Sequence, residues 1–353
     1  MLVNNYADTG IGDFGLDLHK NLARRRIHPN LVSTPTSWID FPRYFLLTLT
    51  FNAQVIFNVG LTSWGPSPLR NFLGFLAIRL RHDLGRKDIV LLSNAIEAID
   101  LDSAGYKVSP IAQKGAHLAI EQLRKIPIIV FSQCMEKILL LHYGIAPVFW
   151  HPAPVVWHSL SANGQTPRTK AQNDLPTLLM IGYLSPYKGY DFLLDALEIA
   201  NFPTRVLIVG DEHRLLKNDP AYQQFLTRLR ARSEAQHITL IPKVPNENLP
   251  DLMARVDLGV LPYEACQGGC AAASLLIAHR VPILATDLPE FRELADLGSG
   301  MVLSSKNPEE FARRIKETME NPNLIANLRS MQERYAKKYS WESFMDRLIE
   351  LLR

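Results

Sequence analysis

The stretch LLMIGYLSPYKGYDFLL, residues 178–194, constrains the fold of this chain more than any other segment. Its apolar start, residues 178–181, predicts a buried strand, and its apolar end has the spacing of one helix face. The loop between them contains Gly182, Pro186, Lys188 and Gly189. Small residues, amides at a helix N-terminus and one lysine charge are what a pyrophosphate requires. An ordinary strand-to-helix turn with a solvated lysine has the same pattern, so this stretch alone leaves both interpretations open.

The same alternation of strands and helices continues through the second half of the chain. Apolar runs predict further strands at 205–209, 237–241, 258–261 and 281–287. An apolar helix is predicted after the turn at Gly268-Gly269. Strands that alternate with helices form a parallel sheet with helices on both faces. The second half is therefore predicted to be a doubly wound α/β domain.

The first half shows this pattern as well. Predicted strands at 2–6, 54–57, 89–92 and 126–132 alternate with predicted helices at 16–24, 69–84, 112–123 and 135–143. A segment rich in Ser, Asn, Gln, Thr and Pro, residues 159–176, predicts a linker. We therefore predict two Rossmann-like domains that face each other across a cleft. The predicted boundaries are 1–165 for the first domain, 176–335 for the second and 336–353 for a last helical part.

Composition excludes several classes of protein. The chain has 353 residues, enough for two buried cores, and its net charge of +3 is too small to indicate nucleic-acid binding. No apolar run is long enough to span a membrane and no signal peptide opens the chain, so we predict a cytoplasmic protein. The three cysteines, Cys134, Cys266 and Cys270, lack the spacing of a zinc site or a disulfide framework. We expect small buried thiols instead.

A glycine turn, Gly10-Ile11-Gly12-Asp13-Phe14-Gly15, follows the first predicted strand. It matches the GxGxxG fingerprint of dinucleotide-binding domains, which also requires an acidic residue about 20 positions later. Residues 30–35 contain no acid, and the next one is Asp40. A nicotinamide cofactor is therefore not expected. The glycines either face another ligand or only turn the chain into its first helix.

The predicted helix at 69–84 combines an apolar side with polar residues that include Arg70, Arg79, Arg81 and His82. A basic amphipathic helix of this kind can lie on an anionic membrane surface. It can also pack on the sheet with its arginines in water, which is the interpretation that we favour. The pattern itself does not separate the two.

Several motifs of the second half resemble retaining glycosyltransferases of the GT-B fold, like those of glycosyltransferase family 4. They are IGYLSPYKGYDFLLDAL, VLIVGD, DLGVLPY, QGG, RVPILATDLPEFREL and the terminal YSWESFMDRLIELL. The resemblance implies that the second domain holds a nucleotide-sugar donor, a UDP- or GDP-sugar, and that no other cofactor is needed. It also implies that the last helix, 341–352, crosses back to the first domain. From the residues alone, a helix that caps its own domain remains the alternative.

The resemblance assigns the donor phosphates to groups on both sides of the cleft. Lys188 would supply the cation, and the amides of Gly268 and Gly269 would supply dipoles at a helix N-terminus. Gly10 and Gly12 would approach the donor from the opposite wall. Because the leaving group takes up negative charge, a fixed cation and aimed amides would contribute most to catalysis.

Two positions depart from the family pattern. Members usually carry a pair of glutamates with seven residues between them, and the equivalent positions here are Gln267 and Leu275. Gln267 can still bond a sugar hydroxyl, whereas Leu275 cannot hold a ribose diol. Tyr183 stands where an arginine is common, so one of two phosphate cations is missing. Glu290 and Glu293 remain as acids that either approach the donor or lie solvated at a helix start.

Acceptor-side groups are expected where the predicted strand 89–92 ends, because ligands of open α/β sheets bind at the carboxyl ends of strands. Ser93, Asn94 and Glu97 follow this strand, and Ser93 stands where relatives often have a histidine. No acidic pair of the DxD type lies near the predicted cleft, so we expect no metal. Expelled phosphate oxygen is a plausible base for the acceptor hydroxyl.

We therefore predict a retaining glycosyltransferase that moves a sugar from a nucleotide sugar to a glycan or a lipid-linked acceptor, with peripheral membrane contact as an option. The missing glutamate pair favours one alternative, a catalytically weak homologue that binds a nucleotide sugar or partners an active subunit. A nucleotide-sugar epimerase of the same fold is the other alternative. Nucleic acid is not an expected partner.

Overall fold

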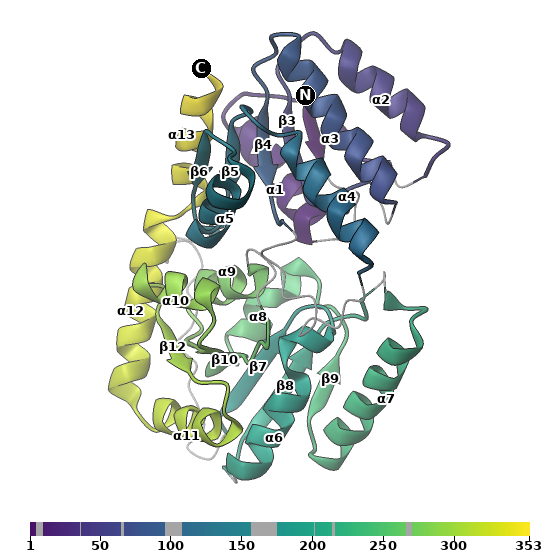
Figure 1. Cartoon of the computed structure of the whole chain (residues 1–353). Coiled ribbons are helices and arrows are strands. Elements are labelled where there is room, and N and C mark those ends of the chain that lie inside the picture. The colour runs from purple at the N-terminus through teal and green to yellow at the C-terminus, as the bar shows by residue number, and fades with distance from the viewer. Residues whose placement is uncertain are drawn as a thin grey trace.

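A computed structural model of the chain describes residues 1–4, 10–35, 37–64, 67–95, 108–156, 175–200, 202–213, 216–265 and 270–353. These residues form two six-stranded sheets with helices packed around each of them (Figure 1). Neighbouring strands are parallel in both sheets. The prediction of two doubly wound α/β domains is confirmed.

The first sheet has the strand order β2-β1-β3-β4-β5-β6. Its strands are β1 (Leu2–Asn4), β2 (Leu31–Ser33), β3 (Ile56–Val59), β4 (Ile89–Leu92), β5 (Ile128–Val130) and β6 (Val148–Trp150). Its helices are α1 (Gly10–Arg24), α2 (Phe41–Thr50), α3 (Pro68–Asp83), α4 (Pro110–Glu121) and α5 (Gln133–Tyr143). Because β1 lies between β2 and β3, the strand order reverses beside β1.

The second sheet has the order β12-β11-β10-β7-β8-β9. Its strands are β7 (Thr177–Ile181), β8 (Arg205–Val209), β9 (Thr239–Ile241), β10 (Leu258–Leu261), β11 (Ile283–Thr286) and β12 (Met301–Ser304). Its helices are η2 (Pro186–Lys188), α6 (Tyr190–Ala200), α7 (Pro220–Ala235), η4 (Asn246–Asn248), α8 (Leu249–Met253), α9 (Ala271–Ala278), α10 (Pro289–Asp296), α11 (Pro308–Met319) and α12 (Pro322–Lys338). The last helix, α13 (Trp341–Leu352), returns to the first domain. Here the order reverses beside β7, between β8 and β10.

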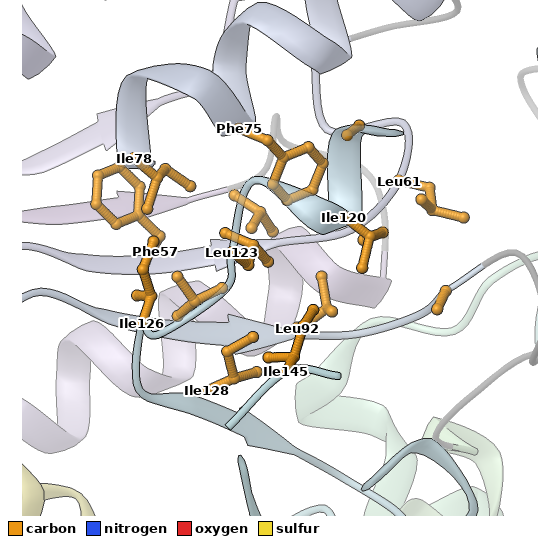
Figure 2. Close-up of a cluster of buried hydrophobic side chains, with 14 of the residues drawn as sticks. Phe57, Leu61, Phe75, Ile78, Leu92, Ile120, Leu123, Ile126, Ile128 and Ile145 are labelled. Atoms are coloured by element: carbon orange, nitrogen blue, oxygen red, sulfur yellow. The ribbon is translucent and has the colours of Figure 1, made fainter. Parts of the chain in front are cut away.

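The central strands are apolar at almost every position because helices cover both faces of each sheet. In the first sheet, alternate residues of β3, β4 and β5 face α3 and α4, where Phe75, Ile78 and Ile120 complete one core cluster (Figure 2). The intervening residues, among them Ile56 and Leu91, face the opposite side. A strand buried on both faces therefore has a continuous apolar run, which is why these runs located the strands.

Helix α13 covers this opposite face of the first sheet. Trp341, Phe344 and Leu348 form one buried cluster with residues of β1, β3, β4, β5 and α1. At the surface, the Arg25 guanidinium lies 2.8 Å from an Asp346 carboxylate oxygen. The carboxyl-terminal helix therefore contributes to the core of the first domain (Figure 1). Most of the predicted linker, residues 159–174, lies outside the described residues.

The structure corrects two expectations about the first domain. The predicted strand 2–6 is described only to Asn4, and α1 begins at Gly10, so the glycines form its first turn and do not precede it. Helix α3 packs on the sheet, but Arg70 and Arg81 are buried and do not lie in water. Their burial removes much of the basic face that a membrane-surface helix would need. Among the described helices none is both long and apolar enough to cross a membrane.

Candidate functional site

The candidate site lies at the carboxyl ends of β7, β8 and β10. In open α/β sheets, ligands bind in the crevice at the point where the strand order reverses, which is beside β7 in this sheet. The segment after β7 carries Lys188, the segment after β8 carries His213, and Tyr263 follows β10. The sequence separates these residues by up to 75 positions, and the parallel sheet brings their loops to one edge.

Two glycines allow the loop after β7 to fit against its neighbours. Gly189 has φ = 74°, and a Cβ at this position would lie 1.8 Å from the Pro262 carbonyl oxygen. Gly182 has φ = 126°, and its Cβ would lie 2.3 Å from Lys188 Nζ. A side chain at either position would meet both backbone strain and a clash. The glycines thus allow the ammonium group of Lys188 to lie directly against the backbone at the end of β7.

Lys188 is a buried cation. The residue is 7% exposed, and its Nζ lies 5.8 Å from the centre of the Tyr263 ring. Burial lowers the pKa of Lys188 to about 8. In the part of the chain that the structure describes, no carboxylate forms an ion pair with it. A buried charge without a counter-ion is costly, so this position favours the arrival of an anion.

The groups beside Lys188 do not neutralise it. Burial raises the pKa of the Tyr263 hydroxyl well above its usual value, and it also raises the pKa of the Cys270 thiol. Both groups are therefore uncharged at neutral pH. Cys270 Sγ lies 3.8 Å from Tyr263 Oη and accepts a hydrogen bond from the amide of Ala273 at 3.4 Å, so it is the N-cap of α9. The start of α9 thus lies close to the lysine.

Helix α9 carries the predicted dipole site at its N-terminus. Three residues predicted to contact the donor, Gln267, Gly268 and Gly269, lie outside the described residues, as does Cys266. Their roles stay predictions. Cys270 immediately follows them, and the charge of Lys188 acts on its thiol. Cys270, the first described residue after this segment, therefore lies near the lysine.

The first domain presents the N-terminal turn of α1 in a comparable position. Asn4 Nδ2 donates to the Gly12 carbonyl oxygen at 2.9 Å, and Asn58 Nδ2 donates to the Ile11 carbonyl oxygen at 2.7 Å. Asn58 Nδ2 also bonds Asn4 Oδ1 at 2.7 Å. This pair of buried asparagines fixes the turn that holds Gly10 and Gly12 beside the reversal point of the first sheet. The sequence analysis missed both asparagines, although a polar residue at the end of a buried strand was the signal.

An ion pair joins this turn to the second domain. Lys243, which follows β9, lies 3.7 Å from an Asp13 carboxylate oxygen in the first turn of α1. Both side chains are about half exposed, so the pair contributes little to stability. It does show that the α1 turn and the carboxyl ends of the second sheet face each other.

The predicted acceptor residues have structural partners. Asn94 Oδ1 accepts a hydrogen bond from the Leu61 amide at 2.9 Å, and the Ser93 amide donates to the Val59 carbonyl oxygen at 3.0 Å. Asn94 therefore braces the loop that follows β3. Glu97 lies outside the described residues. The acceptor role of these three residues stays a prediction.

Glu293 has a partner that the sequence did not indicate. Its two carboxylate oxygens accept hydrogen bonds from the Gln133 amide, at 2.8 and 2.9 Å. Gln133 begins α5, so Glu293 in α10 caps a helix of the other domain. Burial raises the pKa of Glu293, and the α5 amides oppose that shift. Glu293 thus contributes to the contact between the domains. The sequence had left open a donor contact or a solvated position at a helix start for this residue, and the donor contact stays a prediction. Glu290 is half-buried one turn earlier, and its charge acts on both Cys134 and Cys270.

Metal ligands do not gather anywhere in the described ranges. No group of three or more His, Cys, Asp or Glu side chains there could hold a metal ion. Near the candidate site, the described groups that suit an anion include the Lys188 ammonium group and the N-terminus of α9.

Comparisons with known proteins agree with this geometry. Residues 165–339 match the family model described as Glycosyl transferases group 1. The D-inositol 3-phosphate glycosyltransferase of Jonesia denitrificans is 25% identical over 215 residues, which cover 59% of this chain and 49% of that protein. An uncharacterized glycosyltransferase of Methanocaldococcus jannaschii is 23% identical over 165 residues, 46% of this chain and 44% of that one. The chain thus spans about half the length of these curated relatives.

Solved structures match the whole chain. The crystal structure of Anabaena HepE in complex with UDP-glucose has a TM-score of 0.73 at 15% identity, and the match covers 99% of this chain and 98% of that one. Sucrose-phosphate synthase from Thermosynechococcus elongatus has a TM-score of 0.75 at 14% identity, with the same coverage. Similarity at this identity establishes the fold, and the predicted GT-B fold is confirmed.

Proposed function

We propose that this chain, whose residues 165–339 match the glycosyl transferases group 1 family, is a retaining glycosyltransferase that uses a nucleotide-diphosphate sugar. The observation that carries the proposal is Lys188, a buried ammonium group without a carboxylate partner among the described residues, at the point where the strand order reverses. A nucleotide diphosphate supplies the negative charge that this position lacks.

The chemistry follows from where charge develops. When the bond between the sugar and the diphosphate breaks, the leaving oxygen becomes more negative. In this proposal Lys188 and the amides at the start of α9 stabilise that oxygen, and they stabilise it more in the transition state than in the bound donor. We assign Gln267 to a sugar hydroxyl and the leaving phosphate oxygen to the deprotonation of the acceptor. No side-chain base is required in this scheme.

A UDP-sugar is the donor to test first, because the similar HepE structure holds UDP-glucose. We propose that purified protein transfers or slowly hydrolyses a sugar from a panel of UDP- and GDP-sugars, measured as release of UDP or GDP. Binding of a nucleotide sugar without turnover, with any glycan or lipid-linked acceptor, would favour the catalytically weak homologue. Conversion of the donor to its epimer without an acceptor would favour the epimerase.

We further propose that the acceptor is lipid-linked and that the first domain meets the membrane through α2. The outward side of this helix and the turn before it expose Ile39 (90%), Leu46 (62%) and Leu47 (44%), with Arg43 among them. Within α2, Leu46 and Leu47 lie three and four residues after Arg43, so these three side chains project from neighbouring parts of the exposed surface, and Ile39 lies in the turn just before them. Helix α2 forms an outer edge of the first domain (Figure 1). Apolar side chains beside a cation are typical of interfacial helices.

Sedimentation with phospholipid vesicles tests this contact. We expect the protein to bind vesicles that contain an anionic lipid, and we expect the double change Leu46→Glu and Leu47→Glu to weaken binding by about tenfold or more. Leu141→Glu is the matched control, because Leu141 is 81% exposed on α5. The proposed contact would be contradicted if Leu141→Glu weakened vesicle binding as much as the double change does, or if the unchanged protein did not bind vesicles.

A further inference from the structure

The proposed donor site contains one buried cation for a ligand that carries two phosphates. Tyr183 occupies the position where the family usually has an arginine, and a tyrosine side chain cannot supply a positive charge. Next to it lies His213, whose ring centre is 6.1 Å from that of Tyr183 in an edge-on arrangement. His213 comes from the segment after β8 and was not among the residues that the sequence indicated.

The loop that carries His213 is fixed to the loop that carries Lys188. The Gly182 amide bonds the Val209 carbonyl oxygen and the Leu184 amide bonds the Asp211 carbonyl oxygen, both at 2.9 Å. The β7–β8 pairing therefore continues beyond the strands. In addition, the His213 amide donates to Tyr222 Oη at 2.6 Å, and Tyr222 Oη donates to the Leu184 carbonyl oxygen at 2.6 Å. This network holds the backbone of His213 in place.

One polar atom of the imidazole ring, Nδ1, is buried and has no hydrogen-bond partner among the described residues. Burial and the nearby charge of Lys188 lower the pKa of His213, so the ring is neutral at pH 7 in the free protein. The other titratable groups around it give little compensation. Glu212 is paired with Arg230 at 2.6 Å, and Tyr222 is uncharged because burial raises its pKa.

We propose that His213 is the second side chain that contacts the donor diphosphate, and that it takes up a proton from solvent when the diphosphate binds. This inference rests on the proposed function. Before binding, a second positive charge beside Lys188 would be repelled. After binding, the phosphate charge favours the imidazolium, since a nearby anion stabilises a cation. His213 would thus supply the positive charge that Tyr183 does not.

Calorimetric titration with UDP, and in parallel with GDP, tests the proposal at pH 7 in buffers of different ionisation enthalpy. We expect His213→Gln to bind about tenfold more weakly than the unchanged protein and to take up about one proton fewer. His213→Arg should keep the affinity, because arginine is always charged, and should also lack that proton. Titration of the phosphate itself is common to all variants and cancels in the difference. Uridine or guanosine, which lack phosphates, should bind the unchanged protein and the His213→Gln variant with equal affinity.

The control is His28→Gln, which makes the same change at an exposed histidine of the first domain. His213→Gln with unchanged affinity and unchanged proton uptake would overturn the proposal. If that variant fails to fold, His213→Arg decides, since proton uptake equal to that of the unchanged protein would also overturn it. If Lys188→Met lost nucleotide binding while His213→Gln changed neither affinity nor proton uptake, this inference would fail and the proposed function would stand. If the unchanged protein bound neither UDP nor GDP, the proposed function itself would fail, and this inference with it.

Discussion

Replacement of Arg81 by methionine is expected to lower the free energy of unfolding by about 3–5 kcal/mol. The Arg81 side chain is fully buried and uses all of its N–H groups. Nε and Nη2 bond the two carboxylate oxygens of Asp88 at 2.6 and 3.0 Å. The remaining N–H groups bond the carbonyl oxygens of Thr48, Phe51 and Ala53 at 2.6–2.9 Å. Methionine would leave the buried Asp88 carboxylate and the end of α2 without these partners.

Arg79 on the same helix is the matched control. It pairs with Asp83 at 2.9 Å, but both side chains are partly exposed, so Arg79→Met should cost only about 0–1 kcal/mol. Urea unfolding measures both variants through the transition midpoint and slope. Combining Arg81→Met with Asp88→Leu should recover part of the loss, because the stranded charge is then removed. Equal losses for Arg79→Met and Arg81→Met would contradict the assigned role.

Arg81 also shows where prediction from the sequence ends. The apolar spacing placed a helix at 69–84, and the structure has α3 at Pro68–Asp83, because this pattern depends only on local spacing. Whether an arginine on that helix lies in water depends on groups elsewhere. The carbonyl acceptors of Arg81 come from residues 48–53, which no spacing rule connects to position 81. The expectation of solvated arginines therefore failed at Arg70 and Arg81, and it holds in part at Arg79.

The strands were predictable because a parallel sheet buries both of their faces. Residues 89–92 and 178–181 are continuous apolar runs, and they coincide with β4 and most of β7. The glycine turn at residues 10–15 was harder to assign. Glycine is unfavourable within a helix, so this stretch was expected to be a loop before the helix. In the structure it forms the start of α1. The side-chain amides of Asn4 and Asn58 bond its carbonyl oxygens, and local propensity cannot report such long-range partners.

The candidate site was predictable to a different degree at each residue. The loop pattern indicated Lys188, but not that the ammonium group would be buried against Gly182 and Tyr263. Glu293 was indicated as a helix-start acid, and the structure uses it to cap α5 of the other domain. His213 gave no signal, because its position depends on how the loops after β7 and β8 pair. Residue type and spacing thus locate a site, whereas burial and tertiary contacts decide what each side chain does.

Lys188→Met is expected to weaken UDP or GDP binding on the order of 100-fold or more, because the variant removes one partner of a desolvated charge pair. The same change should stabilise the free protein. A lysine whose pKa falls from 10.5 to about 8 on folding carries a penalty of about 3 kcal/mol at pH 7, and methionine has a similar length without the charge. We expect a gain of about 1–3 kcal/mol in the free energy of unfolding. Calorimetry and urea unfolding measure the two effects on one sample.

The pH dependence separates this explanation from a simple packing effect. Between about pH 8 and 10.5 the unfolded chain binds more protons at this lysine than the folded protein does, so the stability of the unchanged protein rises with pH in that window. Below about pH 8 the penalty is fully present. The stability advantage of Lys188→Met should therefore be constant from pH 6 to 7.5 and shrink above pH 8. Over that higher range, nucleotide affinity of the unchanged protein should fall as the ammonium loses its proton.

Lys316→Met is the control for both effects, because Lys316 on α11 is more than half exposed and lies 4.0 Å from Glu320. It should change neither nucleotide affinity nor stability by more than about 0.5 kcal/mol. Lys188→Met is expected to weaken nucleotide binding but to stabilise the free protein. The reason is that the buried ammonium group binds an anion and destabilises the fold when no anion is bound, as expected for a binding site. A Lys188→Met variant that loses stability and keeps its nucleotide affinity would show that the lysine only fills space, and the proposed donor site would then have to lie elsewhere.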